Sequence, residues 1–194
     1  MVESEHAPDD AEKTMAVNDK RSVGMLPIGI LMREHRLIES ITELIVKESA
    51  LISNTGQVDS VLVNLIIDLF RTYVDQTHHG KEEEILFTDL RRKHLSPEHE
   101  KTLNELIEEH AYARRTVANL EDANREYVQG NKEASRNVFQ FLNDLNKLYS
   151  SHIEKEDKKF FIPSMRYFDR QDLRNMLDEF LAFDREMSTH NRQG

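Results

Sequence analysis

The sequence predicts an all-α protein, namely an antiparallel four-helix bundle with an additional C-terminal helix, and three observations indicate this class. Apolar residues recur every three or four positions over long stretches, which is the period of an α-helix. No segment shows the alternating Val, Ile or Thr pattern that is typical of a strand. The 194 residues include only 6 Gly and 4 Pro, and the short connections between patterned stretches favour antiparallel neighbours.

The first two helices are delimited by residues that start or stop helices. The helical pattern begins at Pro27 and ends at Gly56, a residue suited to a left-handed cap. A second pattern runs from Asp59 to Leu90. The basic run Arg91-Arg92-Lys93-His94 follows it, where positive charges complement the dipole at the C-terminus of a helix.

The other three helices begin and end at similar signals. Ser96 predicts an N-cap, and Pro97 suits the first helical position. The third helix is expected to end at Gly130 and the fourth near Pro163. Asp169 is then expected to cap a shorter fifth helix.

These patterns divide the chain into three parts. Residues 1–24 are polar and unpatterned, and we expect them to form an N-terminal tail. Residues 25–168 are expected to form the four-helix bundle, and residues 169–194 the C-terminal helix and tail. A chain of this length suits one domain with a sizeable core.

The composition excludes several classes of function. The net charge of −10 argues against nucleic acid as a partner. The absence of cysteine excludes disulfide scaffolds, thiolate zinc sites, cysteine nucleophiles and cysteine-held iron–sulfur clusters. The N-terminus lacks an apolar leader, and no apolar run reaches the roughly 18 residues of a membrane span. We therefore expect a cytoplasmic protein without a membrane partner.

The most informative feature of the sequence is a repeat that contains histidines. Glu34-His35 recurs as Glu109-His110, at an offset of 75 residues. His78-His79-Gly80-Lys81-Glu82-Glu83 recurs as His152-Ile153-Glu154-Lys155-Glu156-Asp157, at an offset of 74. The chain therefore resembles a duplicated helix pair, in which each copy supplies one His from its first helix and a His-x-x-x-Glu from its second.

The repeated residues are expected to point into the core of the bundle. Residues i and i+4 of a helix share one face about 6 Å apart, so His78 with Glu82, and His152 with Glu156, can reach one inward site. Each pair continues an apolar stripe. A buried carboxylate is costly unless it is protonated, paired or bound to metal. Metal ligation is favoured, and a buried Glu–His hydrogen-bond network without metal is the alternative.

The ligand types indicate the metal. Four imidazoles and two carboxylates without thiolate suit two borderline divalent ions, each held by two His and joined by the carboxylates. Iron is favoured over zinc, because one four-coordinate zinc would leave two ligands unused. A ferritin-like site is disfavoured, because the only Glu-x-x-His in the chain is Glu3 with His6.

These residues together resemble the hemerythrin-like (HHE cation-binding) domain family. The likeness spans about Pro27 to Pro163 and is carried by the ordered set of His and His-x-x-x-Glu, in the segments Leu31-Met32-Arg33-Glu34-His35-Arg36, His78-His79-Gly80-Lys81-Glu82-Glu83 and His152-Ile153-Glu154-Lys155-Glu156-Asp157. The resemblance implies a non-haem di-iron centre, with two iron ions bridged by carboxylates and an oxo or hydroxo group. It also implies terminal ligands His35, His78, His110 and His152, and bridging ligands Glu82 and Glu156.

Several neighbouring residues have open or outward assignments. His79 with Glu83 has the same spacing as His78 with Glu82, but the repeat favours the latter pair. It predicts His79 toward solvent, unless Gly80 loosens the helix enough to change this. Glu34 and Glu109 are likewise expected to face away from the site. The remaining His are expected at the surface or in the tails, namely His6, His94, His99 and His190. Three tyrosines near the ligand level could contact the site or only fill the core, namely Tyr73, Tyr112 and Tyr149.

Two classes of function follow. The first is a di-iron protein that handles O2, NO, peroxide or iron as a sensor, scavenger or redox enzyme, so that its partner is a small diatomic or peroxide ligand. The second is a metal-stabilised regulatory or interaction module without catalytic activity. The resemblance implies an extra His one turn from His110 in oxygen carriers, but Leu106 and Arg114 occupy those positions. Both irons are then expected to keep open positions, unless His79, Glu83 or a Tyr fills one.

Overall fold

The computed structural model describes residues 26–190, and all secondary structure in this part of the chain is helical. The all-α class is therefore confirmed. The expected tail 1–24 and the last residues, 191–194, lie outside the described residues. The elements are α3 (Ile28–Thr55), α4 (Ser60–Leu69), η1 (Phe70–His79), η2 (Lys81–Leu86), α5 (Phe87–Arg91), α6 (Pro97–Val128), η3 (Lys132–Ala134), α7 (Ser135–Lys155), η4 (Glu156–Phe160), α8 (Phe161–Ser164), η5 (Met165–Tyr167) and α9 (Arg170–His190).

The helix boundaries follow the capping residues of the sequence. Gly56 ends α3 in the left-handed region, with φ of 70°. The Asp59 side chain accepts hydrogen bonds from the first turn of α4, and Ser96 accepts one from the first turn of α6. The Asp169 side chain accepts from the backbone N–H groups at the start of α9. These predicted boundaries are confirmed.

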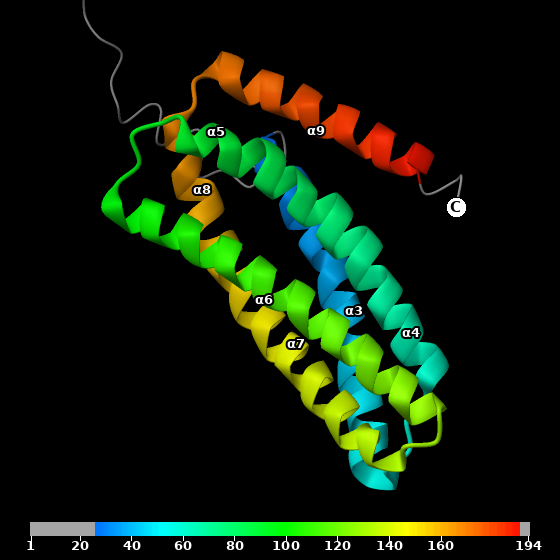
Figure 1. Cartoon of the computed structure of the whole chain (residues 1–194). Coiled ribbons are helices and arrows are strands. Elements are labelled where there is room, and N and C mark those ends of the chain that lie inside the picture. Colours follow the sequence, from blue (N-terminus) through cyan, green and yellow to red (C-terminus); the bar gives the residue numbers. More distant parts are fainter. Residues whose placement is uncertain (1–25, 191–194) are drawn as a thin grey trace, which may run out of the picture.

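Four long helical segments lie alongside one another, and a fifth helix lies outside them (Figure 1). The first and third segments are α3 and α6. The second is continuous from α4 through η1 and η2 to α5, and the fourth continues from α7 through η4 to α8. α7 packs against both α3 and α6, and α4 packs against α6 and α3. α9 packs on η1 and η2.

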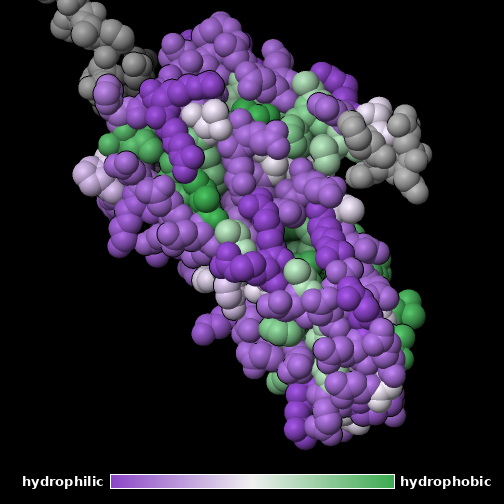
Figure 2. All heavy atoms as spheres, viewed as in Figure 1, coloured by the Kyte–Doolittle hydropathy of each residue, from purple (hydrophilic) through white to green (hydrophobic). Residues whose placement is uncertain are grey.

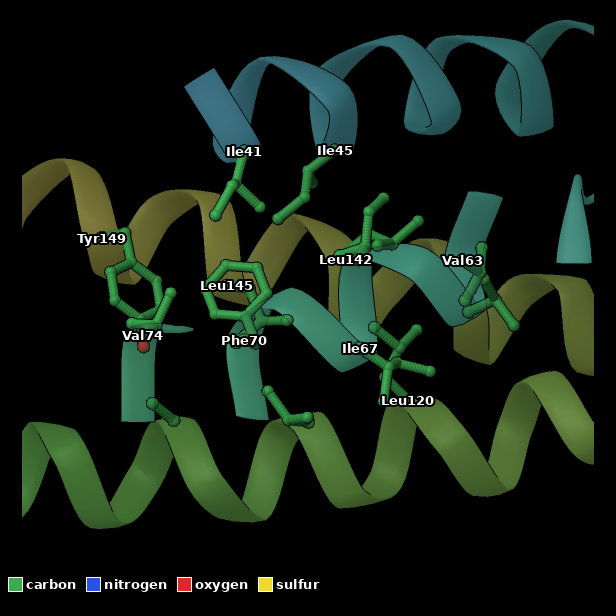
Figure 3. Close-up of a cluster of buried hydrophobic side chains, with 14 of the residues drawn as sticks. Ile41, Ile45, Val63, Ile67, Phe70, Val74, Leu120, Leu142, Leu145 and Tyr149 are labelled. Atoms are coloured by element: carbon green, nitrogen blue, oxygen red, sulfur yellow. The ribbon is translucent and has the colours of Figure 1, made fainter. Parts of the chain in front are cut away.

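Apolar side chains form two separate clusters along the length of the molecule. One cluster joins α3, α4, η1, α6 and α7 (Figure 3), with Ile45, Val63, Leu120 and Leu142 fully buried. The other fills the opposite end, where Met176 and Phe180 of α9 are also fully buried. Between the clusters lies a layer of buried His and Glu side chains.

The second and fourth segments widen into π-helical turns where they meet this polar layer. The backbone N–H of Gly80 donates to Asp75 five residues back, Phe87 donates to Glu82, and Phe161 donates to Glu156. Each such turn inserts an extra residue into the helical repeat and changes which side chains face inward. These turns are often found at functional sites.

The outer surface is mainly polar, as the 32% of charged residues requires. Figure 2 shows a largely hydrophilic face with narrow apolar seams between the helices. Some large apolar side chains remain exposed, including Val61 at 81%. None of the helices within residues 26–190 is long and apolar enough to cross a membrane.

Candidate metal centre

Seven buried side chains meet in the polar layer, one to three from each long segment. The six residues selected from the sequence are all among them, namely His35, His78, Glu82, His110, His152 and Glu156. The seventh is His79, which is 1% exposed. Their backbones belong to α3, to η1 and η2, to α6, and to α7 with η4.

The seven residues form two groups, each of which could hold one ion. The first group is His79, Glu82, His110 and His152, and the second is His35, His78, Glu82 and Glu156. The possible ligand atoms of each group lie within 4.8 Å of one another. Glu82 belongs to both groups, so it joins the two positions.

The two carboxylates lie between imidazoles of different groups. Glu82 places Oε1 3.3 Å from His78 Nε2 and Oε2 3.4 Å from His110 Nε2. Glu156 Oε2 lies 3.1 Å from His35 Nε2 and 3.3 Å from His152 Nε2. Both carboxylates therefore lie near imidazoles of both groups, although Glu156 itself belongs to the second group only.

The partners of these atoms test whether a metal fits. Among the described residues, ten buried side-chain polar atoms lack a hydrogen bond, and seven of them belong to this layer. They are both carboxylate oxygens of Glu82 and of Glu156, and Nε2 of His35, His78 and His79. Buried polar atoms normally have partners, because an unsatisfied one costs about 1–3 kcal/mol. The convergence of seven unsatisfied nitrogen and oxygen atoms fits bound metal better than a metal-free hydrogen-bond network.

Each inward imidazole has a carboxylate on its other nitrogen. His35 Nδ1 lies 2.7 Å from Asp157, and His110 Nδ1 lies 2.7 Å from Glu83. The other three contacts are His78 to Glu34 at 2.9 Å, His152 to Glu109 at 2.8 Å, and His79 to Asp75 at a longer 3.4 Å. A carboxylate on Nδ1 holds that nitrogen protonated and leaves Nε2 as the donor for a metal.

A basic side chain in turn holds each of these outer carboxylates. Arg114 donates to both Asp75 and Glu83, and Arg36 donates to Asp157. Lys81 donates to Glu34, as Lys155 does to Glu109. The repeat therefore extends beyond the ligand layer, because Lys81 and Lys155 hold carboxylates on equivalent imidazoles.

Without metal, the buried groups have strongly altered acidities. Burial raises the pKa of Glu82 well above 4.5, and the nearby Glu156 charge raises it further. Burial also acts to raise the pKa of Glu156, but the neighbouring His152 and His35 outweigh it and lower that pKa. For His35, burial lowers the pKa, whereas Asp157 and Glu156 raise it, to about 9 overall. In the metal-free site, His35 and Glu156 therefore favour each other's charged forms.

The prediction that His79 points to solvent is wrong. Its ring stacks on that of His110, with centroids 3.7 Å apart, and it joins the first group of ligand atoms. The reason is the π-helical turn, which turns both His78 and His79 inward. Glu83 does not act as its partner at the site, and instead contacts His110.

Three further expectations also need correction. Glu34 and Glu109 do not face away, since they reach across to His78 and His152 on neighbouring segments. His99 is not at the surface, since it is 7% exposed and lies in the first turn of α6. Of the three tyrosines, Tyr149 is buried beside His79 and His152.

A cavity of about 240 Å³ lies beside the cluster, between η1, α6 and α7. Phe70, Val117 and Tyr149 form apolar walls, and Arg114 lies at its edge. His79 is the only one of the seven clustered residues that lines it. The His79 ring therefore separates this cavity from the other ligand atoms.

Comparison with known proteins agrees with this geometry. A family model described as the hemerythrin HHE cation binding domain matches residues 26–161. The match contains all seven clustered residues and ends before α9 begins. No curated protein matches the chain.

Proposed function

The chain belongs to the hemerythrin HHE cation-binding family, and from that premise we propose that it binds two iron ions and handles a small molecule such as O2, NO or peroxide. The observation that carries the proposal is the convergence of seven unsatisfied buried donor atoms in two groups that share Glu82. We further propose that residues 25–168 form an antiparallel four-helix bundle around these ions. Residues 169–194 would form the additional helix and tail.

The donor set supports iron. It consists of five imidazoles and two carboxylates, without thiolate, and imidazole with carboxylate suits iron among the common metals. His35, His78, His79, His110 and His152 would be terminal ligands, and Glu82 and Glu156 would bridge. Iron bound here supplies electrons to a small molecule and a coordination position for it.

The two positions differ in their number of imidazoles, although each group contains four residues. One has three imidazoles, from His79, His110 and His152, whereas the other has two, from His35 and His78. With Glu82 and Glu156 both bridging, as proposed, the position with two imidazoles would have one donor fewer, and we expect a small molecule to bind there. The sequence alone led us to expect open positions on both ions, and His79 removes that equivalence.

The residues of the chain prepare this site in three ways. The apolar clusters above and below exclude water, which strengthens electrostatic interactions inside. The outer carboxylates fix the orientation of each ring. Arg36, Lys81, Arg114 and Lys155 hold those carboxylates in place.

Metal analysis of the purified full-length protein tests the proposal. Two irons per chain are expected, with His79→Ala and Glu82→Ala lowering that number and the exposed His94→Ala leaving it unchanged. Two irons that are unaffected by Glu82→Ala would contradict the assigned site. Stoichiometric zinc would contradict the iron assignment and favour a metal-stabilised module, whereas no metal after reconstitution with Fe²⁺ would contradict both.

A further inference from the structure

The C-terminal helix approaches the ligand-bearing segment unusually closely. A Cβ added to Gly80 would lie 2.6 Å from the tip of the Phe183 ring of α9, closer than atoms can pack. Gly80 has ordinary helical backbone angles, so glycine is needed here because it leaves room for the Phe183 ring and not because of its backbone freedom. It stands between His79 and Lys81, within the turn that carries His78 and Glu82.

A buried lysine next to this contact joins α9 to the interior. The Lys81 side chain is fully buried, and its ammonium donates to Asp184 of α9 at 2.6 Å and to Glu34 of α3. Burying a charged ammonium is costly unless acidic partners surround it. Asp184 therefore provides one of the two carboxylates that keep Lys81 inside the fold.

Glu34 continues this connection to the metal centre. It contacts Lys81 with one carboxylate oxygen, and with the other lies 2.9 Å from His78 Nδ1. A continuous chain of contacts thus runs Asp184–Lys81–Glu34–His78. It ends on the position with two imidazoles, where the small molecule is expected.

The second half of the repeat has no such connection. Lys155, the counterpart of Lys81, is 22% exposed, and both of its carboxylate partners lie on α6, at Glu105 and Glu109. Lys155 therefore finds both of its carboxylate partners within the four long segments. Lys81, in contrast, takes one of its two carboxylate partners from α9.

We propose that α9 is a metal-linked helix, whose docking and metal binding at His35 and His78 stabilise each other through Asp184 and Lys81. The inference rests on the proposed metal centre. A cation on His78 Nε2 polarises the ring and strengthens its Nδ1 hydrogen bond to Glu34, which holds Lys81 and, through it, Asp184. Linkage requires the reverse effect to be equal, so a docked α9 raises the affinity of that position.

The test measures affinity and helix docking in the full chain. Fe²⁺ is titrated without oxygen against a competing chelator into wild type, Asp184→Asn and the matched control Glu105→Gln. Asp184→Asn is expected to lower the affinity for one of the two ions about tenfold, which is in the range seen when a contact behind a ligand is lost. Glu105→Gln changes the contact of the equivalent lysine without involving α9 and is expected to leave that ion unchanged.

Hydrogen exchange supplies a second measurement that needs no activity. Amides of α9 are expected to exchange more slowly in metal-loaded than in metal-free wild type, and Asp184→Asn should remove this difference. Phe183→Ala removes the ring contact with Gly80 and should lower the affinity for the same ion. This variant replaces Asp184→Asn in the test if Asp184→Asn does not fold.

Two results separate the possible failures. The linkage would be overturned if wild type binds two ions but its α9 amides exchange equally fast with and without metal, and if Asp184→Asn and Phe183→Ala bind both ions with unchanged affinity. Wild type that binds no ion would instead overturn the proposed metal centre.

Discussion

Replacing Glu82 by Gln is expected to change stability in opposite directions with and without metal. In the metal-free protein, burial and the nearby Glu156 raise the pKa of Glu82 well above 4.5, so the native carboxyl keeps its proton to a higher pH than the carboxyl of the unfolded chain. Keeping it protonated in the fold costs about 1.4 kcal/mol for each pH unit above 4.5 over which the native carboxyl retains its proton. Gln has nearly the same shape and avoids this cost.

The sign of the pH dependence follows from the bound proton. The native state holds a proton that the unfolded chain loses above pH 4.5, so the free energy of unfolding of metal-free wild type falls as the pH rises. Glu82→Gln lacks this contribution, and its advantage should widen from pH 5 to pH 7. At pH 7 the variant should be about 1–3 kcal/mol more stable, or roughly 2–10 °C higher in Tm.

With metal the order reverses. Glu82 serves both groups, and an ion present at about a thousand times its dissociation constant contributes roughly 4 kcal/mol of stability. The assay is thermal unfolding by circular dichroism, with chelator and with excess Fe²⁺ under anaerobic conditions. Glu84→Gln, on the exposed face of the same turn, is the control and should stay within about 0.5 kcal/mol. A chelated Glu82→Gln protein that melts below wild type at pH 7 would refute the reasoning.

Three further outcomes are expected. His79→Ala should lower the iron content to between one and two ions per chain. An iron content equal to that of the exposed His94→Ala variant would mean that His79 only packs in the core. Leu145→Ala, in the fully buried apolar cluster, should lower the free energy of unfolding in urea by about 2–5 kcal/mol, and Val61→Ala at the surface should change it little. Asp59→Ala should lower the free energy of unfolding by about 0.5–2 kcal/mol through loss of the cap of α4, whereas Asp59→Asn, which can still cap the helix, should lower it less.

Much of the fold was predictable because its signals are local. Caps such as Asp59 and Ser96 act within one turn, so their effect is visible in a short stretch of sequence. The inward direction of His35 and His110 was also predictable, because ordinary α-helical spacing continues the apolar stripe. The duplicated pattern added a check that a single copy would not provide.

The missed residues depend on geometry that spacing alone does not give. His79 points inward because η1 is a π-helical turn. The sequence signals for this were the adjacent pair His78-His79 and Gly80, a residue that can loosen the helix. Glu34 and Glu109 reach imidazoles on neighbouring segments, which depends on how the helices are shifted along one another. Their recurrence one position before His35 and His110 could have drawn attention to them.

The contact between His35 and Asp157 joins residues 122 positions apart and has a consequence for the order of assembly. During synthesis α3 leaves the ribosome long before η4 exists, so His35 spends that interval without Asp157 or Glu156. The ligand layer can close only after the fourth segment has docked, which requires a large loop to be closed first. A nascent chain that stops before residue 156 would therefore carry all four residues of the first group but lack Glu156 of the second. Binding of the two proposed ions would therefore be one of the last steps in folding, because it requires all four segments to have docked.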